Sequence, residues 1–322
     1  MLRAVKKVLV AGFLVSCFAL IAPSVGVANT NQSDTTRLVS PETLDALIDA
    51  GSDVQIIDMR AEKYVAKGTI PGAVSLPYKS WRGPKSRPGQ PPTEAKLELF
   101  LGGAGIDLNR PIVVFNHTGK TLQTGQAAYV YWILKTAGAE KAAILSGGFK
   151  AWDAADLTVA AAPTELEPTV VDVAYRDDWW ANPMDIFGVA TGQQRGAILD
   201  ARLDSQVRKS IESGKPMKSM PLARYIPTSL IAPTLSAKRL TDTEMDRFRA
   251  ELEGRGVNLT GDLIISVCQT GELSALSWFY ASEIVGIENV QYYPDALQGW
   301  QADGGLLFGM RTPEALQSTS SN

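Results

Sequence analysis

The sequence predicts an α/β fold that contains two tandem copies of one unit, each a parallel sheet with helices on both faces. Short apolar, β-branched segments alternate with segments of helical periodicity, which is the pattern of a covered parallel sheet. The order of motifs also occurs twice. Residues 197–202 are similar to 56–60, and the loop 268–271 stands where 116–119 stands in the first copy. A repeated order of this kind indicates a duplicated structural unit.

The first copy is predicted to begin with a helix that has Ser40 as its N-cap and Pro41 in its first turn. Gly51 ends this helix, and the other elements follow from apolar runs and the turn residues that flank them. The segment 80–93 is rich in proline, glycine and cations, so we expect an exposed loop there. Helices are predicted over 41–50, 61–67, 94–101 and 122–136, and strands over 54–59, 69–76, 111–115 and 143–145.

A linker rich in alanine, proline and glutamate, residues 160–168, leads to the second copy. Trp179 and Trp180 follow it, and we expect this pair to pack between the copies. An insertion over 213–221 lengthens the second copy relative to the first. Strands are predicted over 170–175, within 197–202 and over 263–267, and helices over 242–254 and 273–284, the last one ending at Gly286.

The chain has 322 residues, of which 45% are hydrophobic and 20% are charged. This balance is that of an ordinary soluble globular protein, and the length allows two domains. The net charge of −3 includes three cations near the start, Arg3, Lys6 and Lys7, so the remainder of the chain carries −6. A chain with this negative net charge is not expected to bind nucleic acid, which is itself negatively charged.

Residues 1–28 have the composition of an export signal, with cations first, an apolar run next and small residues before a cleavage point after Ala28. The apolar run over 8–21 is shorter than the roughly 20 residues that span a bilayer, which disfavours a retained anchor. A lipoprotein is an alternative, because residues 14–17 resemble a lipidation motif that ends in Cys17. The protein is otherwise expected to be periplasmic or exported, with no membrane span after cleavage.

Cys268 stands between the predicted strand 263–267 and the helix that follows it. The N–H groups in the first turn of a helix lack partners and the helix dipole adds positive potential, so an anion is favoured there. A thiol at such a place tends to ionise and to act as a nucleophile. Loss of the export signal would leave Cys268 as the one thiol, without an internal disulfide. A buried, inert cysteine is the alternative.

Several short motifs occur in the same order in both copies. They are Asp58-Met59-Arg60 with Ile70-Pro71-Gly72-Ala73, Ser146-Gly147-Gly148-Phe149-Lys150-Ala151-Trp152, Asp200-Ala201-Arg202 and the loop at Cys268. Together they resemble the rhodanese family of sulfurtransferases in its tandem two-domain form, over about residues 38–305. The resemblance implies that the second domain is active and that the first is not, because Asn116 stands in place of the cysteine.

The resemblance also implies the chemistry. Cys268 would take a sulfur atom from a small donor, thiosulfate by default, hold it as a persulfide and pass it to a thiol or to cyanide. No cofactor is implied. Asp200 and Arg202 are expected to be structural, with substrate contact as the alternative. The cradle of the persulfide would be formed by Gln269, Thr270, Gly271, Glu272, Leu273 and Ser274.

The predicted organisation divides the chain into five parts. Residues 1–28 are the export signal, and 38–158 form a rhodanese-like domain without a catalytic cysteine. Residues 159–190 are the linker and the start of the second domain. The cysteine-bearing domain covers 191–305, and 306–322 form a C-terminal tail.

The cysteine loop departs from the family pattern. Gln269 stands where many members have an arginine, Leu273 where threonine or arginine is common, and Glu272 is acidic. A carboxylate at this place is expected to repel anionic donors and to raise the pKa of the thiol. The sequence therefore does not identify the sulfur donor, and 3-mercaptopyruvate is no better supported than thiosulfate.

The atypical loop supports one competing function, a non-catalytic module that binds sulfur or docks onto an exported partner protein. A phosphatase is disfavoured because that chemistry needs an arginine at the end of the loop, where Leu273 and Ser274 stand. A metal site is not predicted, since one histidine and one mature cysteine cannot form the usual zinc shell. That histidine, His117, is expected to be a surface residue of the first copy's loop.

Overall fold

The computed structural model describes residues 37–215, 217–231 and 241–310. The predicted export signal with Cys17 lies outside the described residues, and so does the part of the predicted tail, 306–322, that follows residue 310. The described part of this segment is not a free tail, because residues 308–309 form a strand that pairs with 218–219.

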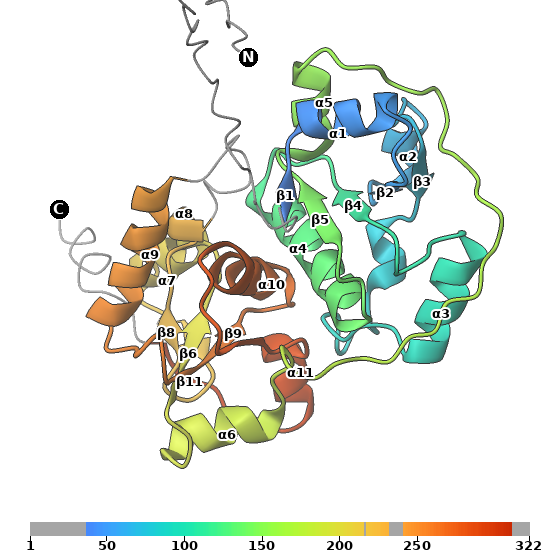
Figure 1. Ribbon diagram of the computed structural model, residues 1–322. Coiled ribbons are helices and arrows are strands. Elements are labelled where there is room, and N and C mark those ends of the chain that lie inside the picture. Colours follow the sequence, from blue (N-terminus) through green and yellow to red (C-terminus); the bar gives the residue numbers. More distant parts are fainter. Residues whose placement is uncertain (1–36, 216, 232–240, 311–322) are drawn as a thin grey trace, which may run out of the picture. The chain divides into compact units, whose positions relative to one another are not determined.

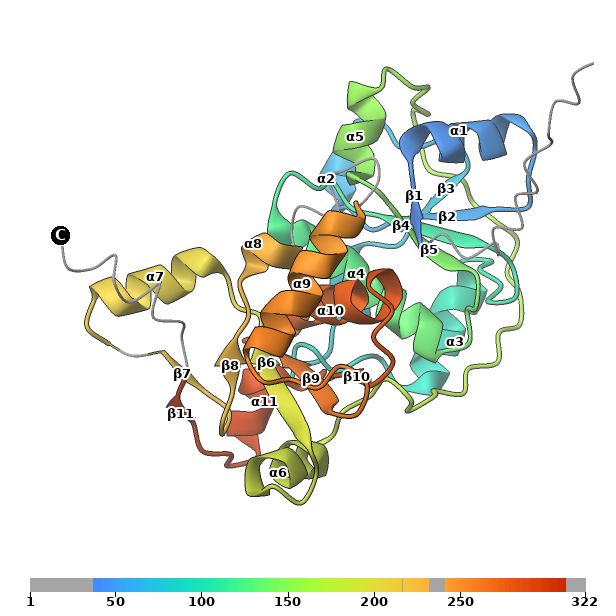
Figure 2. The ribbon, with the colours of Figure 1, turned by 60° about the vertical axis from the view of Figure 1, so that its left-hand side comes forward.

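The described chain contains two parallel sheets, one in each half, which confirms the predicted fold class (Figure 1). Five strands form the first sheet in the order β1-β5-β4-β2-β3, and four form the second in the order β10-β9-β6-β8. Strands β7 and β11 pair as a separate antiparallel ribbon beside α7 (Figure 2).

The first half contributes β1 (Leu38–Val39), α1 (Pro41–Asp49), β2 (Gln55–Asp58), α2 (Glu62–Val65), β3 (Ala73–Ser75), the 3₁₀ helix η1 (Tyr78–Trp81), α3 (Glu94–Gly103), β4 (Ile112–Phe115), α4 (Thr121–Thr136), β5 (Ala142–Leu145) and α5 (Gly148–Ala154). The second half contributes α6 (Pro183–Thr191), β6 (Gly196–Asp200), α7 (Asp204–Glu212), β7 (Lys218–Ser219), β8 (Arg224–Tyr225), α8 (Thr228–Ile231), α9 (Asp242–Gly254), β9 (Leu263–Val267), α10 (Glu272–Trp278), the π-helical turn η3 (Phe279–Ile284), β10 (Val290–Tyr292), α11 (Ala296–Ala302) and β11 (Phe308–Gly309).

Each sheet is covered on both faces, because successive residues of a strand point to opposite sides. In β4, Val113 packs with α1 and α5, whereas Val114 packs with α3 and α4. In β9, Ile264 lies in the core with α9 and α10, and Ile265 lies in the core with α6 and α11. Strands buried on both faces explain why their sequences are continuously apolar.

Capping residues set several helix starts as the sequence predicts. The Ser40 hydroxyl accepts a hydrogen bond from the Thr43 N–H at 3.1 Å, directly before Pro41. Thr241 and Glu244 cap each other's backbone at the start of α9, and this helix ends at Gly254. The predicted bounds of β9 and α9 therefore agree with the structure.

One predicted strand is wrong. Residues 170–175 form no strand, and the second sheet has no counterpart of β1 among the described residues. The backbone N–H of Val173 instead donates to the Glu98 carboxylate at 3.1 Å, and that of Tyr175 donates to Glu94 at 2.8 Å. The linker therefore runs along α3 of the first copy, where glutamate side chains satisfy its backbone in place of a neighbouring strand (Figure 1).

The two copies meet along α4 and α10. Gly125 of α4 lies so close to this contact that a Cβ atom there would stand 2.6 Å from the Glu272 carbonyl oxygen. The tryptophan pair packs at the same contact, as expected, because Trp180 lies 4.9 Å from Trp132 and Trp179 lies 6.5 Å from Trp278 between ring centroids. No helix of the described chain is long and apolar enough to cross a membrane.

We predict that Gly125→Ala destabilises the protein by about 1–3 kcal/mol, because the new methyl group overpacks the contact between α4 and α10. Denaturant unfolding monitored by tryptophan fluorescence measures this change. Gly103→Ala is the matched control, since its Cβ would meet no atom within 4 Å. Alanine should stabilise that helix end by up to about 1 kcal/mol. Equal effects of the two substitutions would contradict the close approach at Gly125.

Candidate active site at Cys268

Cys268 directly follows β9 and precedes α10, so the strand and the helix hold it at the carboxyl edge of the second sheet. The loop backbone is also fixed from α11, because the Leu297 N–H donates to the Cys268 carbonyl at 2.9 Å. Gly271 is required at the start of α10. Its φ is 104°, and a Cβ there would lie 2.5 Å from the Tyr292 hydroxyl oxygen.

Two donors point at the sulfur atom. The Gly271 N–H donates to Cys268 Sγ at 3.2 Å. The Ser274 hydroxyl also lies 3.2 Å from Sγ and 3.0 Å from the Gly271 carbonyl oxygen. A sulfur atom that carries negative charge would gain most from these donors, since hydrogen bonds to ionised groups are the stronger ones.

The other members of the predicted cradle have different contacts. The Gln269 carbonyl accepts from the Gln298 N–H at 3.3 Å, which joins the loop to α11. The Thr270 hydroxyl donates to the Glu272 carboxylate at 2.6 Å. Leu273 is 6% exposed and belongs to the hydrophobic core. Of the six predicted cradle residues, Ser274 is therefore the one whose side chain is hydrogen-bonded to Sγ.

The Glu272 carboxylate is buried and is paired with a guanidinium of the first copy. Its Oε1 atom lies 3.2 Å from Arg82 Nη2 and accepts from the Tyr78 hydroxyl at 3.2 Å. Arg82 also donates to the Thr270 carbonyl at 3.0 Å. The predicted repulsion of anionic donors is thus offset in part, because a guanidinium lies directly against the carboxylate.

The structure corrects the expected state of the thiol. Cys268 is 2% exposed, and burial raises the pKa of its thiol above the ordinary value. The hydrogen bond from Ser274 lowers this pKa, whereas the negative charge of Glu272 raises it further, as predicted. The prediction of a reachable thiol is therefore wrong for this conformation, and burial opposes the ionisation that the donors at the helix start favour.

A segment of the first copy, residues 82–90, packs on the cysteine loop, and we call it the cover segment. This segment belongs to the loop 80–93, which the sequence predicts to be exposed. Only its middle, residues 84–86, forms a continuous exposed stretch. Gly89, however, packs so tightly on the second copy that a Cβ would stand 1.9 Å from the Pro294 carbonyl oxygen and 3.2 Å from that of Thr270. Arg87 of the same segment forms ion pairs with Asp295 and Asp303.

Asp200 and Arg202 form a buried ion pair next to the site. Arg202 Nη2 lies 2.7 Å from Asp200 Oδ2 and donates to the Lys218 carbonyl at 2.8 Å. Asp200 pairs in register with Val267, directly before Cys268. Its carboxylate accepts from the Ser219 hydroxyl at 2.5 Å. These contacts tie together the loops after β6 and before β8, which is the structural role that the sequence favoured.

The site also contains residues that the sequence analysis missed. Tyr78 and Arg82 hold Glu272. The Tyr292 hydroxyl is buried beside Gly271 and has no hydrogen-bond partner among the described residues. No motif marks these positions, because Tyr78 and Arg82 are far from the cysteine loop along the chain. Within the described chain, no group of three or more histidine, cysteine and acidic residues could hold a metal ion.

Comparison with known proteins agrees with this architecture. The sequence model described as "Rhodanese-like domain" matches residues 40–155. The 3-mercaptopyruvate sulfurtransferase of Escherichia coli (strain K12) is 26% identical over 286 residues, which are 84% of this chain and 97% of that protein. The thiosulfate sulfurtransferase of Azotobacter vinelandii is 24% identical over 265 residues, 82% of this chain and 93% of that protein.

Solved structures show the same fold. The crystal structure of SseA from Escherichia coli, described as a 3-mercaptopyruvate sulfotransferase with the rhodanese fold, superposes with a TM-score of 0.66 at 23% identity. It covers 81% of this chain and 99% of that chain. YnjE superposes with a TM-score of 0.69 at 17% identity over 87% of this chain and 70% of that chain. The chain therefore has the tandem rhodanese fold, and it is similar over most of its length to a 3-mercaptopyruvate sulfurtransferase and to a thiosulfate sulfurtransferase.

Proposed function

We propose that this protein is a sulfurtransferase that moves a sulfane sulfur from a small donor to a thiophilic acceptor through a persulfide on Cys268. The observation that carries the proposal is the placement of Sγ between β9 and α10, with the Gly271 N–H and the Ser274 hydroxyl directed at it. Similarity to sulfurtransferases over most of the chain supports the same chemistry.

The reaction has two displacement steps. The Cys268 thiolate attacks the outer sulfur of thiosulfate, the sulfur–sulfur bond breaks, and sulfite leaves with the bonding electron pair. The persulfide then carries a negative terminal sulfur, for which the donors around Gly271 are suited. An acceptor thiolate or cyanide attacks that sulfur and regenerates the Cys268 thiolate. No general base is needed once the thiol is ionised.

Thiosulfate is the donor that we propose by default. The relatives include enzymes named for 3-mercaptopyruvate and for thiosulfate, so 3-mercaptopyruvate is the donor to be compared with it. Either donor must reach a sulfur atom that is 2% exposed. We therefore infer that the cover segment moves away from the cysteine loop, at least near Gly89, during each turnover.

A non-catalytic module that stores sulfur or docks onto an exported partner is the second candidate function. The buried thiol with its raised pKa favours it, because a neutral, covered thiol reacts slowly. Turnover separates the two candidates, since a persulfide that forms and is not passed on would support storage.

We predict that the wild-type protein gains about 32 Da, one sulfur atom, when it is incubated with thiosulfate or 3-mercaptopyruvate, because the Cys268 thiolate takes the sulfur. Intact-mass spectrometry measures the adduct, and Cys268→Ser should show none. Addition of cyanide or a small thiol should remove the adduct and release one product molecule per sulfur. A protein that forms no adduct with any donor would contradict the catalytic proposal.

The reactivity of Cys268 should depend on the charge of Glu272. Because this carboxylate raises the pKa of the thiol, Glu272→Gln should lower that pKa, so that the thiolate forms at lower pH. The rate of alkylation by iodoacetamide, measured against pH, should therefore have its midpoint at lower pH than in the wild type. Glu253→Gln, an exposed position on α9, is the control and should leave the profile unchanged. An unchanged or alkaline-shifted profile for Glu272→Gln would refute the electrostatic link.

We also propose that residues 1–28 direct export and are removed. When the full chain is produced in a bacterial host, the mature protein should begin at Asn29, which N-terminal sequencing of the periplasmic fraction tests. Lipidation would instead leave Cys17 as a modified first residue and would be abolished by Cys17→Ala. Full-length protein retained in the cytoplasm would exclude both processing routes.

A further inference from the structure

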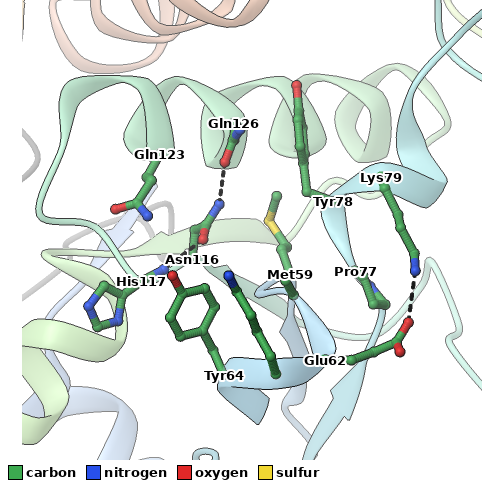
Figure 3. Close-up of a pocket in the computed structure, with 12 residues that line it drawn as sticks. Met59, Glu62, Tyr64, Pro77, Tyr78, Lys79, Asn116, His117, Gln123 and Gln126 are labelled. Carbon is green, nitrogen blue, oxygen red and sulfur yellow. Dashed lines mark hydrogen bonds and ion pairs between the residues drawn. The ribbon is translucent and has the colours of Figure 1, made fainter.

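The first copy contains a pocket of about 410 Å³ that the proposed sulfur transfer does not use (Figure 3). It lies where β2 and β4 end, between the short helix α2, the turn η1 and the start of α4. We call it the first-copy pocket. Small-molecule sites in proteins commonly measure about 300–1,000 Å³, so its size suits a compact organic ligand.

The first-copy pocket occupies the same topological position as the cysteine loop of the second copy. In the first sheet the chain leaves β2 towards β3 and leaves β4 towards β5, on opposite sides. The second sheet repeats this arrangement at β6 and β9. Ligands of open α/β sheets bind at such switch points, outside the carboxyl ends of the strands. The cover segment fills this place in the second copy, whereas the first copy leaves it hollow.

The position of the nucleophile is taken by an amide that has its own partners. Asn116 is 5% exposed, and its Nδ2 donates to Gln126 Oε1 at 2.7 Å. Its Oδ1 accepts from the His117 N–H at 2.7 Å. Figure 3 shows Asn116 near Met59 and His117 next to Tyr64 at the pocket. A neutral, fully bonded amide has no nucleophilic electron pair to offer, so this pocket can bind a ligand but cannot take sulfur from it.

His117 has an unused polar atom at this pocket. Its Nδ1 is buried and has no hydrogen-bond partner in the described chain. The ring, which was expected on the surface, is half-buried and stacks on Tyr64 at 5.8 Å between centroids with an angle of 11°. The imidazole ring thus forms part of the pocket wall, whereas its Nδ1 atom is closed off from the space that a ligand would occupy.

The charge at the first-copy pocket favours an anion. Lys79 is paired with Glu62 at 2.8 Å, so these two charges cancel. Lys63 also lines the pocket and makes no ion pair within the described chain, and its ammonium lies 5.0 Å from the Tyr64 ring. The remaining walls include the apolar side chains of Met59 and Pro77. One unpaired cation beside apolar walls fits a singly charged organic acid.

We propose that the first-copy pocket binds a small organic carboxylate or sulfonate, with its acidic group on Lys63 and its apolar body against Tyr64 and Met59. His117 lies beside the ligand as part of the pocket wall, with its ring stacked on Tyr64. The second copy would then perform the chemistry, and the first copy would act as a binding domain. This assignment does not depend on sulfur transfer at Cys268.

The chain offers a direct reporter, because His117 is its one histidine. All imidazole signals in a heteronuclear NMR spectrum therefore come from the pocket. We would titrate Cys268→Ser, in which no sulfur is transferred, with benzoate and with its neutral analogue benzamide. Benzoate should shift the His117 ring signals in a saturable way, and benzamide should bind at least about tenfold more weakly because it lacks the charge.

Lys63→Met should weaken benzoate binding by about tenfold or more, whereas Lys67→Met, beyond the end of α2 and outside the pocket lining, should leave it unchanged. The proposal is overturned if benzoate causes no saturable shift of the His117 signals, if benzamide binds equally well, or if both lysine variants bind benzoate as the parent does. Failure of sulfur transfer by wild-type protein would not affect any of these outcomes.

Discussion

The cysteine loop depends on one contact between the copies, the pairing of Glu272 with Arg82, which is the first residue of the cover segment. A carboxylate inside the cysteine loop would be costly to bury alone, and the guanidinium of the first copy offsets that cost. Tyr129 of α4 holds the segment near both ends, because its hydroxyl shares one proton between the carbonyls of Trp81, directly before the segment, and Gln90. The first copy thus builds one wall of the second copy's site.

The surroundings of Cys268 act on the thiol in two opposing ways. Burial favours the neutral thiol, whereas the Gly271 N–H and the Ser274 hydroxyl are directed at the sulfur. Those donors contribute most when the sulfur is charged. Under the proposed mechanism, opening of the cover segment would expose the sulfur and thereby favour the thiolate, which water or a donor could then reach.

The same place in the fold is built differently in the two copies. In the second copy the loop after β9 carries the thiol and is closed by the first copy. In the first copy the loop after β4 carries Asn116, and the equivalent space is a pocket. Tyr78 belongs to both, since it lines the first-copy pocket and donates to Glu272. The two sites are therefore neighbours within one core.

The sequence by itself determined the α/β class, the repeated order of elements and the place of Cys268 between β9 and α10, because periodicity, caps and turn residues act over a few neighbouring residues. It also placed Asp200 and Arg202 in a structural role. It misjudged residues 170–175, whose apolar pattern suits a strand but whose backbone is bonded by the side chains of α3. The burial of the thiol, the pairing of Glu272 with Arg82 and the pocket at His117 were decided by tertiary structure alone. Each depends on which distant segments lie against one another, and local sequence carries no record of those contacts.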